Sequence, residues 1–325
     1  MMHYLFRRLL YFIPILLGIN LITFLLFFMV NTPDDIARMH LGAKHIEQQT
    51  INDWKAAHGY DLPLFYNDKQ TGLQQIKATL FFEKSLLLFT FNFGMSDEGR
   101  DISHDISYRM WPSFAIALPI LFFDILTNII LAMAMAFFRT SYLDLIGVIT
   151  CIILMSISAL FYIIGGQYLF GKVLKLVPIS GYEGGFNALK FIVLPVTVAV
   201  LGELGSGARW YRTLFLEEIH KDYVKTARAK GLSERTVLFK HVLKNTMIPI
   251  LTGIVVIIPS LFMGSLVLES FFGVPGLGSY IIDAISQQDF AIVRAMVFLG
   301  SILYIVGLVL TDFSYMIVDP RVRLS

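Results

Sequence analysis

Six apolar runs, each about as long as a bilayer-spanning helix, constrain this chain more than any other feature. They cover residues 9–30, 114–138, 145–170, 189–208, 248–272 and 292–317. A helix needs about 20 apolar residues to cross the hydrocarbon core, whereas a membrane β-barrel would show short segments of alternating polarity. Since 56% of the residues are hydrophobic and only 15% are charged, we expect an all-α integral membrane protein with six transmembrane helices.

The gaps between the runs suggest how the chain is organised. The first run follows Arg7 and Arg8, exceeds the apolar core of a signal peptide and is followed by no small-residue cleavage site, so we expect a retained helix. We therefore divide the chain into a first transmembrane helix at residues 1–30, a small extracytoplasmic segment at 31–113, a transmembrane core at 114–318 that contains the loop 209–247, and a tail at 319–325.

The distribution of positive charge favours one orientation. The short segments on the side of the N-terminus hold 14 Lys and Arg residues, whereas those on the other side hold four. The long segment 31–113 holds eight, but long loops cross the membrane largely regardless of charge. Because cytoplasmic loops carry the excess of positive charge, we expect a multi-pass protein of the cell (inner) membrane with both termini in the cytoplasm. The net charge of +2 is too small to indicate nucleic-acid binding.

The loop at residues 209–247 is the most informative stretch. It holds nine Lys and Arg residues against four acidic ones. Residues 223–230 suit a short helix that ends at Gly231, where a left-handed backbone is needed. Ser233 suits the N-cap of a second helix, whose residues Val237, Leu238, Val242 and Leu243 fall on one face. The pattern predicts two helices joined at an elbow.

The elbow allows two interpretations. It could dock onto another protein and transmit that protein's motion to the spans, or it could lie on anionic lipid headgroups as an ordinary positive-inside loop. Orientation alone does not require a helix–Gly–Leu–Ser–helix arrangement, so the residues leave the two interpretations about equal.

The sequence of the elbow resembles the EAA loop of ATP-binding-cassette importer permeases, in the form used by the oligopeptide/dipeptide/nickel family. That form runs Asp-Tyr-Val-x-Thr-Ala-Arg-Ala-Lys-Gly-Leu-Ser, and this chain matches it from Asp222 to Ser233. The resemblance assigns to ATPase coupling the following residues: Asp222, Tyr223, Lys225, Thr226, Ala227, Arg228, Lys230, Gly231, Ser233, His241 and Asn245. Further similarity at residues 268–278 and near the C-terminus extends it over nearly the whole chain.

The resemblance implies partners and a mechanism. It implies a second, homologous permease subunit, two ATPase subunits and an extracytoplasmic solute-binding protein, all working at the lipid bilayer. ATP and Mg²⁺ would bind in the ATPases, and this chain would bind no cofactor and catalyse no reaction. Closure of the ATPases would move the elbow and rock the spans between outward and inward access.

Three places inside or beside the spans could line a path or form a gate. Glu269, near the end of the 248–272 run, could contact a peptide amine or cap backbone amides of the adjoining loop, and ionisable groups at such depth are functional candidates. Pro275-Gly276 suits a tight turn in which Gly276 takes a positive φ. Asp124 and Asn128, one turn apart, could hydrogen-bond between helices or face a path.

No catalytic constellation and no metal-ligand spacing emerges from the sequence. The histidines of the external segment, His40, His45, His58 and His104, are scattered, and we expect them simply to be exposed. The favoured function is the permease subunit of an ATP-driven peptide importer. The alternatives are a nickel or metal-chelate importer permease and, from another class, a membrane scaffold or sensor that recruits an ATPase.

Overall fold

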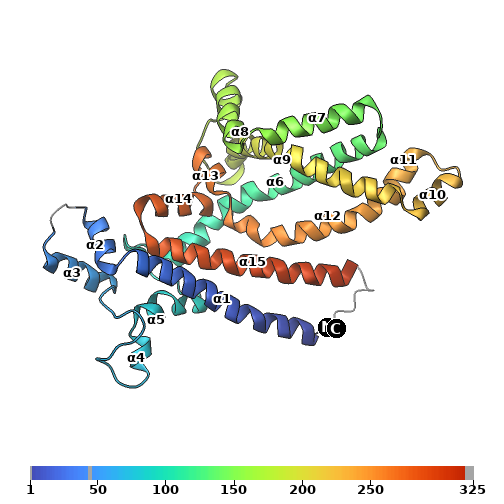
Figure 1. The fold of residues 1–325 in the computed structure, drawn as a ribbon. Coiled ribbons are helices and arrows are strands. Elements are labelled where there is room, and N and C mark those ends of the chain that lie inside the picture. The colour runs from blue at the N-terminus through green and yellow to red at the C-terminus, as the bar shows by residue number, and fades with distance from the viewer. Residues whose placement is uncertain (1, 43–45, 319–325) are drawn as a thin grey trace. The chain divides into compact units, whose positions relative to one another are not determined.

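The computed structural model describes residues 2–42 and 46–318, and its regular structure is helical throughout this part of the chain (Figure 1). The chain divides into two compact units. The first comprises the described residues up to Met110 together with Tyr280–Val309, and the second comprises Trp111–Ser279 and the described residues from Leu310 onward. The all-α fold expected from the sequence is confirmed, whereas the tail at 319–325 lies outside the described residues.

The first unit combines long apolar helices with several short ones. Its elements are α1 (Met2–Val30), α2 (Pro33–Leu41), α3 (Gln48–His58), α4 (Gln74–Lys77), α5 (Leu80–Lys84), the 3-10 helix η1 (Leu86–Thr90), the start of α6 (Ile102–Phe137), most of α14 (Leu277–Gln287) and most of α15 (Phe290–Val318). Thr32 and Asp35 form a reciprocal capping box at the start of α2.

Aromatic side chains form the core of the first unit. Phe24 and Phe28 of α1 pack with Ile36, Tyr60 and Leu80, all of them buried. The buried Asn20 donates a hydrogen bond from its amide nitrogen to the carbonyl oxygen of Ser85 at 2.9 Å. Apolar contacts and a satisfied polar group therefore anchor the segment after α1 onto that helix.

The second unit contains most of the remaining helices. Its elements are the rest of α6, α7 (Tyr142–Ser156), α8 (Ala159–Gly166), the π-helix η2 (Gln167–Val173), the 3-10 helix η3 (Gly185–Asn187), α9 (Ala188–Ile219), α10 (Asp222–Ala229), α11 (Glu234–Thr236), the π-helix η4 (Val237–Val242), α12 (Leu243–Ile257), the 3-10 helix η5 (Ile258–Met263) and α13 (Leu266–Phe272).

Helix α9 is the centre of the second unit, because it packs against α7, α8 and α12. The contact with α7 is close: a Cβ at Gly205 would lie 2.5 Å from the carbonyl oxygen of Cys151 and 2.8 Å from the backbone nitrogen of Met155. Small residues allow membrane helices to approach in this way. Ala132 and Ala136, four residues apart on α6, are fully buried in the same unit.

The candidate spans differ in detail from the apolar runs. Within residues 2–42 and 46–318, five helical stretches are long and apolar enough to cross a membrane, and the number rises to seven if the bent pairs α7–α8 and α13–α14 each count as one span. The expectation of a continuous helix over 145–170 is wrong, because the chain bends by 87° between Ser156 and Ala159. Ile157 has an extended backbone there, and Ser156 bonds back to the carbonyl of Ile152, a contact that bends helices.

The expected span at 248–272 is also wrong in its bounds. Helical structure begins at Glu234, and Gly264, at φ +67, separates η5 from α13. The second expected span begins earlier than its apolar run, because α6 starts at Ile102. Hydropathy identifies only the apolar part of a helix. Polar turns that extend the helix beyond the lipid are not detected, so the predicted bounds are too short.

Candidate coupling elbow and membrane cavity

The elbow predicted from the sequence is present. Helix α10 runs from Asp222 to Ala229, and Gly231 follows it at φ +76, in the left-handed region. The Ser233 hydroxyl accepts a hydrogen bond from the backbone nitrogen of Thr236, as an N-cap does. In Figure 1, α10 and α11 lie at the end of the α9–α12 pair, and only two residues separate α9 from α10.

A hydrophobic core fixes the elbow to the neighbouring helices. Val224 of α10 and Val237, Leu238 and Val242 of η4 are at most 1% exposed. They share one cluster with Phe215 of α9. Burying each such aliphatic side chain contributes about 1.5–3 kcal/mol relative to leaving it exposed. The predicted apolar face is confirmed, although Leu243 is only partly buried.

An ion pair closes the turn between the two elbow helices. Arg228 donates to Glu234 through Nε at 3.1 Å and Nη2 at 2.7 Å, which is a two-point pairing. Arg139 at the end of α6 lies 3.4 Å from the same carboxylate. The pairing raises the pKa of the Arg228 guanidinium. Arg228 is therefore committed to holding the elbow together, a role that its place in a basic motif did not indicate.

Tyr223 joins α10 to the end of α9. Its hydroxyl donates to Oε1 of Glu218 at 2.5 Å. Burial, with this hydrogen bond, raises the pKa of Tyr223 to about 12, so the phenol is a neutral donor at ordinary pH. Ala227, on the same inner face, is 5% exposed. Tyr223 and Ala227, two of the residues that the resemblance assigned to coupling, thus support the elbow from its inner side.

The outer face of the elbow is polar and open. Lys225 pairs with Asp222 at 2.8 Å, but their side chains are 67% and 95% exposed. The remaining exposed residues from α10 to the N-cap of α11 are Thr226, Ala229, Lys230, Gly231, Leu232 and Ser233. His241 lies on the π-helix η4, and its carbonyl accepts a hydrogen bond from Asn245 at 3.2 Å. The sequence-assigned residues therefore separate into an inner supporting set and an outer set available to a partner.

Two cations that the sequence placed in the loop lie elsewhere. Arg209 and Arg212 belong to α9, which continues to Ile219. Arg212 binds Asp144 of α7 through two hydrogen bonds of 2.8 and 2.7 Å. This pair ties α7 to α9, and Asp144, which directly precedes the apolar run 145–170, gave no sign of it in the sequence.

Glu269 lies in a cage of backbone amides. It is 1% exposed, and its two carboxylate oxygens accept hydrogen bonds from the backbone nitrogens of Ser265 at 3.2 Å and Ser279 at 3.1 Å. Two roles were considered for Glu269, contact with a peptide amine and capping of backbone amides in the adjoining loop. These hydrogen bonds correspond to the second role. A part in gating stays a prediction.

Gly276 is required for a reason other than the one expected. Its φ is not positive, so the expectation of a left-handed turn residue is wrong; the positive φ values of this region belong to Gly264 and Gly273. A Cβ at Gly276 would lie 2.3 Å from Oε2 of Glu269 and 2.4 Å from Oγ of Ser113. The turn that follows α13, including Pro275, thus wraps closely around the carboxylate, and Ser113 accepts a hydrogen bond from the backbone nitrogen of Leu277 at 2.8 Å.

A cavity of about 330 Å³ lies beside this turn within the second unit. Its walls are mostly apolar, and its acidic groups come from Asp124 of α6, Glu203 of α9 and Glu269. A second cavity of about 290 Å³ shares Ile120, Glu203, Ser265 and Leu268 with the first. Asp124 lines the first cavity, and a place for it on a solute path stays a prediction.

Asn128 does not line either cavity. It is fully buried, and it donates to Oδ1 of Asp124 at 2.7 Å on the same helix. A Cβ at Gly207 of α9 would lie 2.4 Å from its side-chain amide, so Asn128 is a packing residue. Glu203 was missed by the sequence reasoning, although the only acidic residue of an apolar run is a signal that could have found it.

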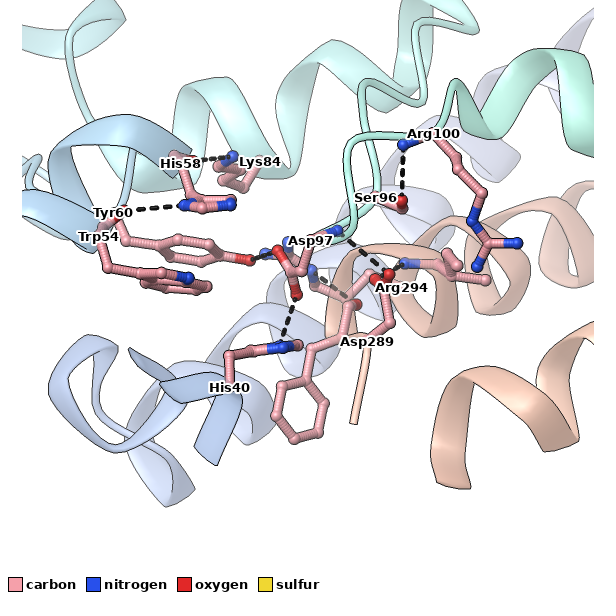
Figure 2. A network of polar contacts seen from close by, with 12 residues as sticks. His40, Trp54, His58, Tyr60, Lys84, Ser96, Asp97, Arg100, Asp289 and Arg294 are labelled. Carbon is pink, nitrogen blue, oxygen red and sulfur yellow. Dashed lines mark hydrogen bonds and ion pairs between the residues drawn. The ribbon is translucent and has the colours of Figure 1, made fainter. Parts of the chain in front are cut away.

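The histidines of the first unit are more organised than expected. Trp54 stacks between His40 and His58, with ring centroids 5.3 and 4.1 Å apart. Figure 2 shows that Tyr60 and His40 both meet Asp97, at 2.9 and 3.5 Å. The expectation that His40 and His58 are simply exposed is wrong, since both are half-buried. His104 is exposed, and His45 lies outside the described residues.

Comparison with known proteins agrees with this architecture. Residues 128–324 match the family described as binding-protein-dependent transport system inner membrane component, and residues 1–84 match the corresponding N-terminal family. A putative peptide transport system permease protein of Brucella abortus is 32% identical, covering 96% of each chain. The oligopeptide transport system permease protein of Bacillus subtilis is 28% identical over 98% of this chain and 99% of its own. The dipeptide transport system permease protein of the same organism is 29% identical over 75% of this chain and 78% of its own.

Proposed function

The chain belongs to the family of binding-protein-dependent transport system inner membrane components, and from this premise we propose that it is one of two non-identical permease subunits of an ATP-driven peptide importer. Its relatives named for dipeptide and oligopeptide transport support the choice of substrate. The partners would be a homologous permease, two ATPase subunits that bind ATP and Mg²⁺, and an extracytoplasmic solute-binding protein.

The observation that carries the proposal is the construction of the elbow. A force applied to the exposed face of α10 reaches α9 through Tyr223 and Glu218, and reaches η4 and α12 through the buried Val224. The pairing of Arg228 with Glu234 keeps the two elbow helices from opening under that force. An ATPase that closes on ATP would therefore move the ends of two long helices together, which is what alternating access requires.

The cavity supports peptides as the solute. Peptides carry an α-ammonium group, and Asp124 and Glu203 offer two carboxylates in walls that are otherwise mostly apolar. Ionisable groups at membrane depth usually mark a substrate or ion path. The ligand would act on the transport cycle only through its different affinities for the outward and inward states.

The charge distribution supports the orientation. With the elbow in the cytoplasm, the short cytoplasmic segments carry most of the Lys and Arg residues, and both termini would lie on the same side as the ATPases. The chain would then be a multi-pass subunit that performs no catalysis of its own.

Co-purification followed by reconstitution tests the proposal. A mild-detergent pull-down should recover a second permease and P-loop ATPases, and proteoliposomes that contain the complex and its binding protein should take up labelled peptides with ATP. Asp124→Asn with Glu203→Gln should lower uptake while leaving the assembly intact. Recovery of the chain without any ATPase would contradict the proposal. Recovery with an ATPase but no ATP-dependent uptake of any solute would favour a scaffold or sensor, and uptake of nickel complexes but not peptides would favour a metal-chelate importer.

A further inference from the structure

A cavity of about 150 Å³ in the first unit lies between α5, the segment after η1 and the start of α15. Two cations line it, Lys84 and Arg294, together with the exposed Glu83. The rest of its wall includes the apolar side chains of Leu87, Phe93 and Met95. Figure 2 shows both cations near Asp97 and the residues that contact it, Tyr60 and His40.

Arg294 is a buried cation that forms no ion pair with any residue that the structure describes. It is 3% exposed, its Nε donates to the carbonyl of Phe290 at 3.2 Å, and its guanidinium lies 4.9 Å from the ring centre of Phe28. Its Nη1 has no hydrogen-bond partner, and no carboxylate among the described residues lies within 4 Å of it. A buried charge in this condition is costly unless something pairs with it.

Lys84 is in a similar position. Its Nζ donates to the carbonyl of His58 at 2.8 Å and lies 4.8 Å from the ring centre of Tyr60, and it forms no ion pair within the described part of the chain. Burial and the charge of Arg294 lower the pKa of Lys84. Two cations thus face one cavity, and the charge of Arg294 disfavours the charged form of Lys84.

The nearby buried carboxylates, Asp97 and Asp289, have contacts of their own and form no ion pair with Lys84 or Arg294 among the described residues. Asp97 meets Tyr60 and His40, and Asp289 accepts hydrogen bonds from the backbone nitrogens of Asp97 and Ile292. The charged groups that line the cavity are therefore Lys84, Arg294 and Glu83, with a formal sum of one positive charge.

We propose that this cavity binds a phosphate group, carried by a phospholipid headgroup or free in solution. A phosphate diester bears one negative charge and would balance the sum of the lining groups. Its oxygens accept the directed hydrogen bonds that a guanidinium donates. The apolar walls and the place of Arg294, one turn into the candidate span that begins at Phe290, suit a headgroup, because headgroups lie at the ends of spans.

Thermal stability of the delipidated, detergent-purified importer complex tests the site. The titrants are dioctanoyl phosphatidylglycerol, inorganic phosphate and dioctanoylglycerol, which has the same chains but no phosphate. We expect a saturable rise in Tm with the phospholipid and none with dioctanoylglycerol. An equal rise with inorganic phosphate would support the site and assign it to the free anion.

Variants separate the site from general lipid effects. Lys84→Gln and Arg294→Gln should each weaken the phospholipid's apparent affinity about tenfold, since each removes one charge-assisted contact. Glu83→Gln, at an exposed position, should tighten it, and Lys190→Gln, an exposed cation outside the cavity, should leave it unchanged. An affinity that responds to neither Lys84→Gln nor Glu83→Gln, or stabilisation by dioctanoylglycerol equal to that by the phospholipid, would overturn the proposal.

Discussion

Glu234→Gln should loosen the elbow without unfolding the protein. The substitution keeps the shape of the side chain but removes the negative charge that Arg228 and Arg139 share. The apolar core of Val224, Val237 and Leu238 is untouched, so the elbow helices should still form. What should change is the free energy of opening the turn between them.

The structure sets the size of the effect. The side chains of Arg228 and Glu234 are 31% and 36% exposed, so solvent screens their attraction and the pair belongs near the upper end of surface ion pairs. Two-point geometry and a second arginine place its contribution at about 1 kcal/mol. A loss of about 1 kcal/mol raises the local opening constant about fivefold.

Hydrogen–deuterium exchange of residues 222–237 in the assembled complex measures this directly. We expect exchange about fivefold faster than in the unmodified protein, and a lower uptake per ATP hydrolysed. Lys225→Gln is the matched control, because it removes an ion pair from the same helix whose side chains are far more exposed, at 67% and 95%. Exchange that is unchanged in Glu234→Gln, or equally fast in both variants, would refute the reasoning.

Three further substitutions test separate features. Gly205→Ala should destabilise the α7–α9 contact by about 3 kcal/mol, because its Cβ would meet backbone atoms, whereas Gly165→Ala, with open space around it, should leave Tm unchanged. Gly231→Ala should cost about 1–2 kcal/mol through its positive φ alone, measured as faster exchange of the elbow, and a cost near zero would contradict the assignment of backbone strain. Glu269→Gln should cost about 1–3 kcal/mol and expose residues 264–279 to proteolysis; protection equal to wild type would show that the backbone cage does not depend on the carboxylate.

Local chemistry explains what the sequence predicted well. The elbow depends on a glycine with a left-handed backbone, an N-cap serine and apolar residues at helical spacing, and each of these is a property of neighbouring residues. The helical fold follows from apolar length, since a chain in lipid must satisfy its backbone hydrogen bonds internally.

Contacts between distant residues were not predictable in this way. The pairing of Arg212 with Asp144 joins two helices, and the cage around Glu269 needs Ser113 together with the turn after α13. The bend after Ser156 lies inside an apolar run and involves no proline, so neither hydropathy nor a helix-breaking residue indicates it. The sequence placed Gly276 in a tight turn correctly but attributed the glycine to a positive φ. The actual reason is the close approach of the Glu269 and Ser113 side chains, which leaves no local sequence pattern.

Photo-crosslinking from the outer face of α10 tests the central claim most directly. Benzoylphenylalanine at the exposed Thr226 of the assembled importer should crosslink to an ATPase subunit, with a yield that changes when ATP is bound. The same group at Thr197, an exposed position in the span of α9, should not reach an ATPase. Crosslinks from Thr226 to lipid alone, in a complex that retains its ATPases, would contradict the account of this elbow as the coupling element.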